Sequence, residues 1–125
     1  MDILIVDDVF TETKVLERIL SKMGFQVGVA QSATDALEYI INHQDIRMVI
    51  MNVMMPALDG INATQMIRNK LYNPLSIVGY SSDSSSEMVN SCLESGMNSF
   101  LSKPFQLDDI RQLLLLHNLK PTSPL

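Results

Sequence analysis

The middle of the sequence, from Arg47 to Gly60, reads R-M-V-I-M-N-V-M-M-P-A-L-D-G. It opens with the apolar run Met48–Met51, and one polar residue, Asn52, follows that run directly. A short apolar run closed by a polar side chain is typical of a buried strand that presents a functional group at its carboxyl end. Asp59 and Gly60 then open a segment with helical spacing. The segment therefore predicts a strand followed by a helix, with Asn52 at the end of the strand.

Similar apolar runs occur at regular intervals along the chain, and each is followed by a segment of helical spacing. We expect strands at residues 3–6, 25–30, 48–51, 76–80 and 99–101. Strands that alternate with helices predict an α/β fold in which a parallel sheet is covered on both faces. Such sheets place their functional sites outside the carboxyl ends of the strands.

The helical segments carry apolar stripes and capping signals. The stripes are expected to include Val15, Ile41 and Leu93. Ser32 and Asp59 stand where N-caps belong, and Ser84-x-x-Glu87 has the pattern of a capping box for the fourth helix.

Length and composition fit one domain in a reducing compartment. The 125 residues suit a single core, which we assign to residues 1–119, and residues 120–125 have the composition of a tail or linker. Lys and Arg total 9 against 14 Asp and Glu, and the net charge of -5 argues against nucleic-acid binding. The single cysteine excludes an internal disulfide. We find neither an apolar run long enough for a membrane helix nor a signal peptide, so we expect a cytoplasmic domain.

Polar side chains follow four of the expected strands. Asp7 and Asp8 follow the first, Asn52 the third, Ser81 the fourth and Lys103 the fifth. Because the carboxyl ends of parallel strands meet at one edge of the sheet, these groups should share one crevice. Adjacent carboxylates repel each other, and a hard cation such as Mg²⁺ relieves that repulsion. An ammonium and a hydroxyl are suited to hold phosphate oxygens.

Taken singly, each residue also has an ordinary structural explanation. Asp7 and Asp8 could cap the first helix, Lys103 could be an exposed surface lysine, and Ser81 could be a loop serine. Their joint placement at successive strand ends favours a shared site for Mg²⁺ and a phosphoryl group.

These motifs give the chain a resemblance to the receiver domain of two-component response regulators over residues 1–118. The matching residues are Asp7-Asp8, the segment N-V-M-M-P-x-x-D-G from Asn52 to Gly60, Ser81, and Lys103-Pro104-Phe105. The resemblance implies a doubly wound, flavodoxin-like (βα)5 fold with strand order 2-1-3-4-5. It also implies a signalling domain that accepts a phosphoryl group from a histidine.

The resemblance assigns roles to the metal-binding and acceptor positions. Asp7, Asp8 and the backbone carbonyl of Met54 look like Mg²⁺ ligands. Position 52 is where the family has the aspartate that takes the phosphoryl group, and Asn52 would be at most a weak ligand.

Three further residues take roles from the same resemblance. Ser81 would follow the phosphoryl group on activation, and Phe100 looks like the aromatic residue that moves with it. Lys103 would bridge the site, and its bond to Pro104 is expected to be cis, as is usual in the family.

Asn52 is the departure that determines the expected chemistry. A carboxylate can attack phosphorus, whereas a neutral amide is a poor nucleophile at neutral pH. The family catalyses only its own phosphoryl transfer and dephosphorylation, and Asn52 should block both and weaken Mg²⁺ binding. We therefore expect a non-phosphorylatable variant held near the inactive state. The alternative is a natural pseudo-receiver that acts as a protein-interaction module without phosphorylation.

The expected partners are a histidine kinase or a histidine phosphotransfer protein. The leucine run Leu113–Leu116 is too long for a helix to bury completely, so a homodimer or output partner could bind through the fourth and fifth helices. Neither direct nucleic-acid binding nor membrane binding is expected.

Other functions fit the sequence poorly. A flavin-binding protein of similar architecture needs a phosphate loop after the first strand, but this chain has the acidic segment D-D-V-F-T-E-T there. A nucleotide hydrolase would need G-x-x-x-x-G-K-[ST], which the chain lacks. His43 and His117 lack partners at metal-ligand spacing and are expected to be helix-end cations.

Overall fold

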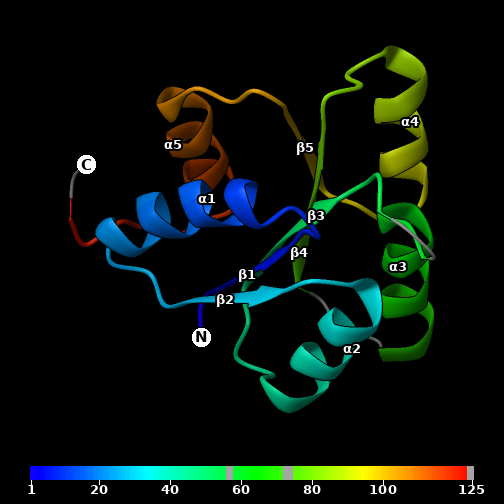
Figure 1. Cartoon of the computed structure of the whole chain (residues 1–125), viewed down its shortest axis with the longest axis horizontal. Helices are drawn as coiled ribbons and strands as arrows, with labels where there is room; N and C mark the ends of the chain where they lie inside the picture. The colour runs from blue at the N-terminus through cyan, green and yellow to red at the C-terminus, as the bar shows by residue number, and fades with distance from the viewer. Residues whose placement is uncertain (56–57, 72–74, 124–125) are drawn as a thin grey trace.

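The computed structural model describes residues 1–55, 58–71 and 75–123, in which strands alternate with helices (Figure 1). The strands are β1 (Ile3–Val6), β2 (Val27–Ala30), β3 (Met48–Asn52), β4 (Ser76–Ser81) and β5 (Ser99–Ser102). The helices are α1 (Phe10–Lys22), α2 (Ala33–Asn42), α3 (Gly60–Met66), α4 (Ser86–Glu94) and α5 (Leu107–Leu116), and a π-helical segment, η1 (Ile67–Leu71), continues α3. The predictions that concern Pro56 and the last two residues of the tail lie outside the described residues.

The five strands form one parallel sheet in the order β2-β1-β3-β4-β5, which confirms the predicted fold class. Strand β2 begins two residues later than predicted. The backbone N–H of Phe25 donates instead to the carbonyl of Leu20 at the end of α1, and that of Gln26 donates to a carboxylate oxygen of Asp2. These two residues therefore form the turn into the strand.

Helices cover both faces of the sheet, with α1 and α5 on one face and α2, α3 and α4 on the other (Figure 1). The burial of β1 on both faces explains why its sequence is continuously apolar. Ile3 and Ile5 belong to the core beneath α1 and α5, whereas Leu4 and Val6 belong to the core on the opposite face. A strand buried on both faces has no solvent-facing positions.

Two predicted helix caps are confirmed and one is wrong. Ser32 and Asp59 each accept a hydrogen bond from the backbone N–H three residues on, at 3.1 and 2.8 Å. Helix α4 is capped by Ser85 rather than Ser84. The carboxylate of Asp83 accepts the Ser85 N–H at 3.1 Å and forms a turn that moves the helix start by one residue.

The buried stripes of the helices are narrower than predicted. Val15, Ile41 and Leu93 lie at the margins of their stripes and are 52%, 53% and 45% exposed. In α5, Leu113 and Leu114 are buried, and the next two leucines are both exposed. These helices thus bury fewer apolar residues than their sequence patterns predicted.

The segment after α5 lies against the far end of α1. The backbone N–H groups of Thr122 and Ser123 donate to the carbonyl of Met23 at 2.9 and 3.2 Å, and Leu119 is buried. The first part of the predicted tail is therefore hydrogen-bonded to the domain. In the described part of the chain, no helix has the length and apolar character needed to cross a membrane.

Candidate functional site

The ends of neighbouring strands lie level at one edge of the sheet. Val6 of β1 is opposite Met51 of β3, so Asp7 and Asn52 are the next residues on two hydrogen-bonded strands. Asn52 is in turn opposite Tyr80 of β4. This register follows from the parallel pairing and places the predicted residues side by side.

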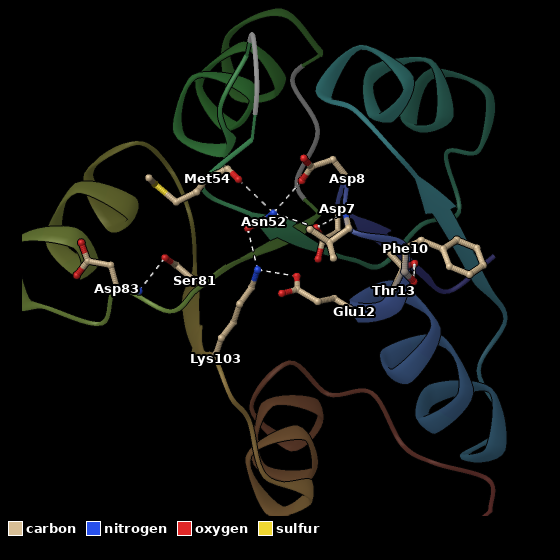
Figure 2. A network of polar contacts seen from close by, with 11 residues as sticks. Asp7, Asp8, Phe10, Glu12, Thr13, Asn52, Met54, Ser81, Asp83 and Lys103 are labelled. Atoms are coloured by element: carbon tan, nitrogen blue, oxygen red, sulfur yellow. Dashed lines mark hydrogen bonds and ion pairs between the residues drawn. The ribbon is translucent and has the colours of Figure 1, made fainter.

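The amide of Asn52 is the centre of a network of polar contacts (Figure 2). Its Nδ2 lies 2.9 Å from Asp7 Oδ1, 3.3 Å from Asp8 Oδ1 and 3.3 Å from the backbone oxygen of Met54. Its Oδ1 accepts a hydrogen bond from the ammonium of Lys103 at 3.2 Å. The structure thus brings four of the predicted site residues around the side chain of a fifth, Asn52.

Gly60 allows α3 to begin directly against the end of β3. A Cβ at this position would lie 2.6 Å from the backbone oxygen of Asn52 and 2.9 Å from the Cα of Val53. The N–H of Gly60 also donates to the carbonyl of Val53 at 2.9 Å. The glycine predicted as part of the family motif therefore fixes the backbone on which Asn52 stands.

Lys103 makes an ion pair that the sequence analysis did not predict. Its Nζ lies 2.7 Å from a carboxylate oxygen of Glu12, and it stands over the ring of Tyr80 at 4.6 Å from the centroid. Glu12 lies in the first turn of α1, which starts just past the end of β1. The sequence does show an acid in this first turn, and because the turn faces the same edge of the sheet as Lys103, that acid could have predicted the ion pair.

Asp7 is held in an environment that disfavours its charge. Burial raises the pKa of this carboxyl to about 7, and the neighbouring carboxyl of Glu12 adds to the rise. The N–H of Val9 and the ammonium of Lys103 act in the opposite direction. The pKa of Glu12 is lowered by its contact with Asp7 and by the Lys103 ammonium, although burial of Glu12 acts in the opposite direction.

Neither Asp7 nor Asp8 caps α1. Val9 is the N-cap residue, and its N-cap position has no side-chain capping bond. Asp7 Oδ1 instead accepts the N–H of Val9 at 3.0 Å, which fixes the carboxylate at the end of β1. The ordinary explanation of the acid pair as helix caps is therefore wrong.

The two predicted switch residues, Ser81 and Phe100, lie on β4 and β5. Ser81 is buried, and its Oγ accepts the N–H of Asp83 at 3.1 Å (Figure 2). Phe100 is half-buried and packs against the core on the α4 side. A Cβ on Gly79 would lie 2.7 Å from Met97 Sδ and 3.4 Å from Phe100 Cδ2, so the glycine avoids a clash with Met97 rather than with this ring.

Lys103 follows β5 in the predicted way. Its backbone N–H donates to the carbonyl of Ser81 at 2.8 Å, and its peptide bond to Pro104 is cis, as expected. The two histidines make other contacts: His43 stacks on Tyr39, and His117 Nε2 lies 2.7 Å from the hydroxyl of Ser99. Burial lowers the pKa of His117, which argues against its expected role as a helix-end cation.

The oxygen atoms at this edge fit a hard cation. Asp7 Oδ2 is buried and has no hydrogen-bond partner among the described residues. Asp8 Oδ1 and the Met54 carbonyl lie beside it around the Asn52 amide (Figure 2). Carboxylate and carbonyl oxygens are the ligands that Mg²⁺ accepts. In the described part of the chain, no three His, Cys, Asp or Glu side chains form a metal site, so the backbone carbonyl would be needed as a ligand.

Comparison with known protein families identifies the family to which this fold belongs. The family model described as the response regulator receiver domain matches residues 3–115. This chain belongs to the receiver domain family. Receiver domains act in two-component and phosphorelay signalling, and the acid pair and lysine stand where the resemblance placed them.

The curated relatives of this receiver domain include much longer kinases. The chain is 42% identical over 118 residues to the sensor histidine kinase RcsC of Escherichia coli strain K12, covering 94% of this chain and 12% of RcsC. It is 36% identical over 116 residues to the hybrid signal transduction histidine kinase E of Dictyostelium discoideum, covering 90% of this chain and 7% of that kinase. The chain thus spans about a tenth of the length of these relatives, and it is related to their receiver domains.

A solved complex shares the fold. It contains the Saccharomyces cerevisiae histidine phosphotransfer protein Ypd1 and the receiver domain of Ssk1. The match has a TM-score of 0.83 and 24% identity, and it covers 90% of this chain and 85% of that chain. At this sequence identity the comparison shows a shared fold and no more.

Proposed function

We propose that this receiver domain accepts a phosphoryl group from a histidine at position 52 when that position is aspartate, with Mg²⁺ held by the acid pair. The convergence of Asp7, Asp8 and Lys103 on the side chain of residue 52 carries this proposal. In the transfer, the bond from phosphorus to the histidine nitrogen breaks while a carboxylate oxygen forms a bond to phosphorus. Mg²⁺, when bound, would offset the negative charge of the phosphoryl oxygens.

Each side chain of the chain itself then has a defined task. Asp7, Asp8 and the Met54 carbonyl would hold the cation, and the ammonium of Lys103 would hold a phosphoryl oxygen. The hydroxyl of Ser81 would leave the N–H of Asp83 and donate to a second phosphoryl oxygen. With Asn52 in place, the neutral amide cannot act as the nucleophile, so this chain performs neither phosphoryl transfer nor dephosphorylation and stays near the inactive state.

The proposed donor is a histidine kinase or a histidine phosphotransfer protein. A groove of about 650 Å³ lies next to Lys103, and its lining comes from α1, from the strand end of β4 and from the segment after β5. The residues that line it are Thr11, Glu12, Val15, Tyr80, Ser82, Lys103, Pro104 and Phe105. The groove would let a partner helix bring its histidine to the strand ends, and the receiver of Ssk1, which shares this fold, is solved together with a histidine phosphotransfer protein.

Replacing Asn52 with aspartate tests the proposal directly. Incubation of Asn52→Asp with acetyl phosphate and Mg²⁺ should add one acid-labile phosphoryl group, measured by intact-protein mass spectrometry. The chain with Asn52 should gain none under the same conditions. A matched control, Asn62→Asp, places a new carboxylate at an exposed position in the first turn of α3 and should also gain none. If Asn52→Asp keeps its unmodified mass, the proposal is wrong.

A second candidate is a phosphorylation-independent interaction module. One observation favours it: Asn52 and the Lys103–Glu12 ion pair already link the polar side chains of the site to one another, although Asp7 Oδ2 has no partner among the described residues. A partner of such a module should bind Asn52 and Asn52→Asp with equal affinity in the absence of a phosphoryl donor. A receiver in the ordinary sense should instead change its affinity for output partners when Asn52→Asp is phosphorylated.

A further inference from the structure

The orientation of the Asn52 amide is fixed by its surroundings. Three oxygen atoms face its nitrogen, from Asp7, Asp8 and the Met54 backbone, and the ammonium of Lys103 faces its oxygen (Figure 2). An amide nitrogen only donates and an ammonium only donates, so the reverse orientation would set donor against donor and acceptor against acceptors. The network therefore has a single arrangement.

The three oxygens around Nδ2 belong to the three groups that would hold the cation. Two of them, Asp8 Oδ1 and the Met54 carbonyl oxygen, would be ligands themselves, and the third, Asp7 Oδ1, belongs to the carboxylate whose other oxygen, Oδ2, has no partner among the described residues. The distances from Asp7 Oδ1, Asp8 Oδ1 and the Met54 oxygen to the nitrogen are 2.9, 3.3 and 3.3 Å, and the Asn52 side chain is 3% exposed. Two amide hydrogens are shared among three acceptors. The partial positive charge of the NH₂ group therefore stabilises these oxygens as a small cation would, but more weakly. The oxygen by which Asn52 was expected to bind a cation weakly is turned toward Lys103.

We propose that the Asn52 amide occupies the position of the cation and competes with Mg²⁺ for its ligands. This inference rests on the proposed magnesium site, and it adds a second reason for weak binding. The first reason is the loss of the negative charge at residue 52, which would weaken Mg²⁺ binding equally whether that residue is asparagine or alanine. Occupation of the position is specific to asparagine, because Mg²⁺ can bind only after the amide has released its oxygens.

The two causes are separated by comparing three side chains at position 52. Asn52→Ala removes the amide and leaves the charge unchanged, whereas Asn52→Asp restores the charge. Asn52→Ala should bind Mg²⁺ about tenfold more tightly than the chain with Asn52, the factor that corresponds to one net hydrogen bond of about 1.4 kcal/mol. Asn52→Asp should bind more tightly than both.

Magnesium titration followed by NMR gives these affinities without any phosphoryl donor. The backbone N–H signals of Asp8 and Val9 report binding in all three proteins. In the chain with Asn52, the side-chain NH₂ signals should exchange slowly with water, and saturating Mg²⁺ should expose them. This last measurement needs no substitution, so it tests the proposal even if the alanine variant fails to fold.

The outcomes distinguish this inference from the proposed function. If Asn52→Asp binds Mg²⁺ but Asn52→Ala binds no more tightly than the chain with Asn52, amide occupation is wrong and the magnesium site stands. Fast exchange of the Asn52 side-chain NH₂ before Mg²⁺ is added would likewise overturn it. If Asn52→Asp itself fails to bind Mg²⁺, the proposed function fails, and the inference fails with it.

Discussion

Replacing Asp7 with asparagine should remove most of the fall in stability that we expect between about pH 5 and 7. In the folded protein, burial first and then the Glu12 carboxyl raise the pKa of Asp7 from 3.8 to about 7. Between these two values the unfolded chain has already released the proton that the folded protein keeps. The free energy of unfolding therefore decreases as the pH rises through this range and levels off above about pH 7.

The size of the effect follows from the width of the window. Each pH unit changes the free energy of unfolding by about 1.36 kcal/mol, so two units correspond to roughly 3 kcal/mol. Glu12 contributes little here, because its pKa is lowered from 4.5 and its effect falls at lower pH. His117 acts in the opposite direction, because burial lowers its pKa and stability is lost as the pH falls.

Urea unfolding in EDTA at a series of pH values measures this dependence in both proteins. The difference in unfolding free energy between the chain with Asp7 and Asp7→Asn cancels the contribution of the histidines, which both proteins share. The asparagine also keeps an oxygen for the Val9 N–H, so the end of β1 should retain its structure. A difference between the two proteins that stays constant from about pH 5 to 7 would refute the reasoning.

Three further perturbations probe the geometry around the site. Gly60→Ala should destabilise the domain by about 2 kcal/mol, because its Cβ would meet rigid backbone. Gly28→Ala is the matched control and should lose less stability, because its Cβ would meet the flexible side chain of Met1 and the edge of the Tyr39 ring. Equal losses of stability in thermal unfolding would contradict this account. A double-mutant cycle with Glu12→Gln and Lys103→Met should give a coupling energy of about 1 kcal/mol that shrinks at high salt, whereas no coupling would show that the pair adds no stability. Removal of the α3 cap by Asp59→Ala should cost about 1 kcal/mol in urea unfolding, and an unchanged midpoint would argue against the cap.

The pattern of apolar runs was enough to predict the parallel sheet and the edge at which the site lies, whereas the strand order came from the family resemblance. Four-residue apolar runs such as Ile3–Val6, when they alternate with helices, are typical of a parallel sheet covered on both faces, and parallel strands end at one edge. For this reason Asp7, Asn52 and Lys103 could be placed together although the sequence separates them widely. Family resemblance supplied their roles, which position alone does not give.

Other features depend on contacts that a sequence pattern does not specify. The pairing of Glu12 with Lys103 depends on the exact start of α1, and the two residues are 91 positions apart. The choice of Ser85 over Ser84 as a cap depends on a turn made by Asp83. The side of the Asn52 amide that faces the acids depends on where Lys103 stands, so it emerges only once all these groups are in place.

The polar network joins residues from the two ends and the middle of the chain, with 45 positions between Asp7 and Asn52 and 91 between Glu12 and Lys103. Contacts of such long sequence separation form late, because the entropy of closing the intervening loops must be overcome first. The slowly exchanging amide of Asn52 should therefore appear only in the last stage of refolding. A chain stopped before β5 would lack Lys103, so nothing would fix which side of the Asn52 amide faces the acids, even with the first four strands paired.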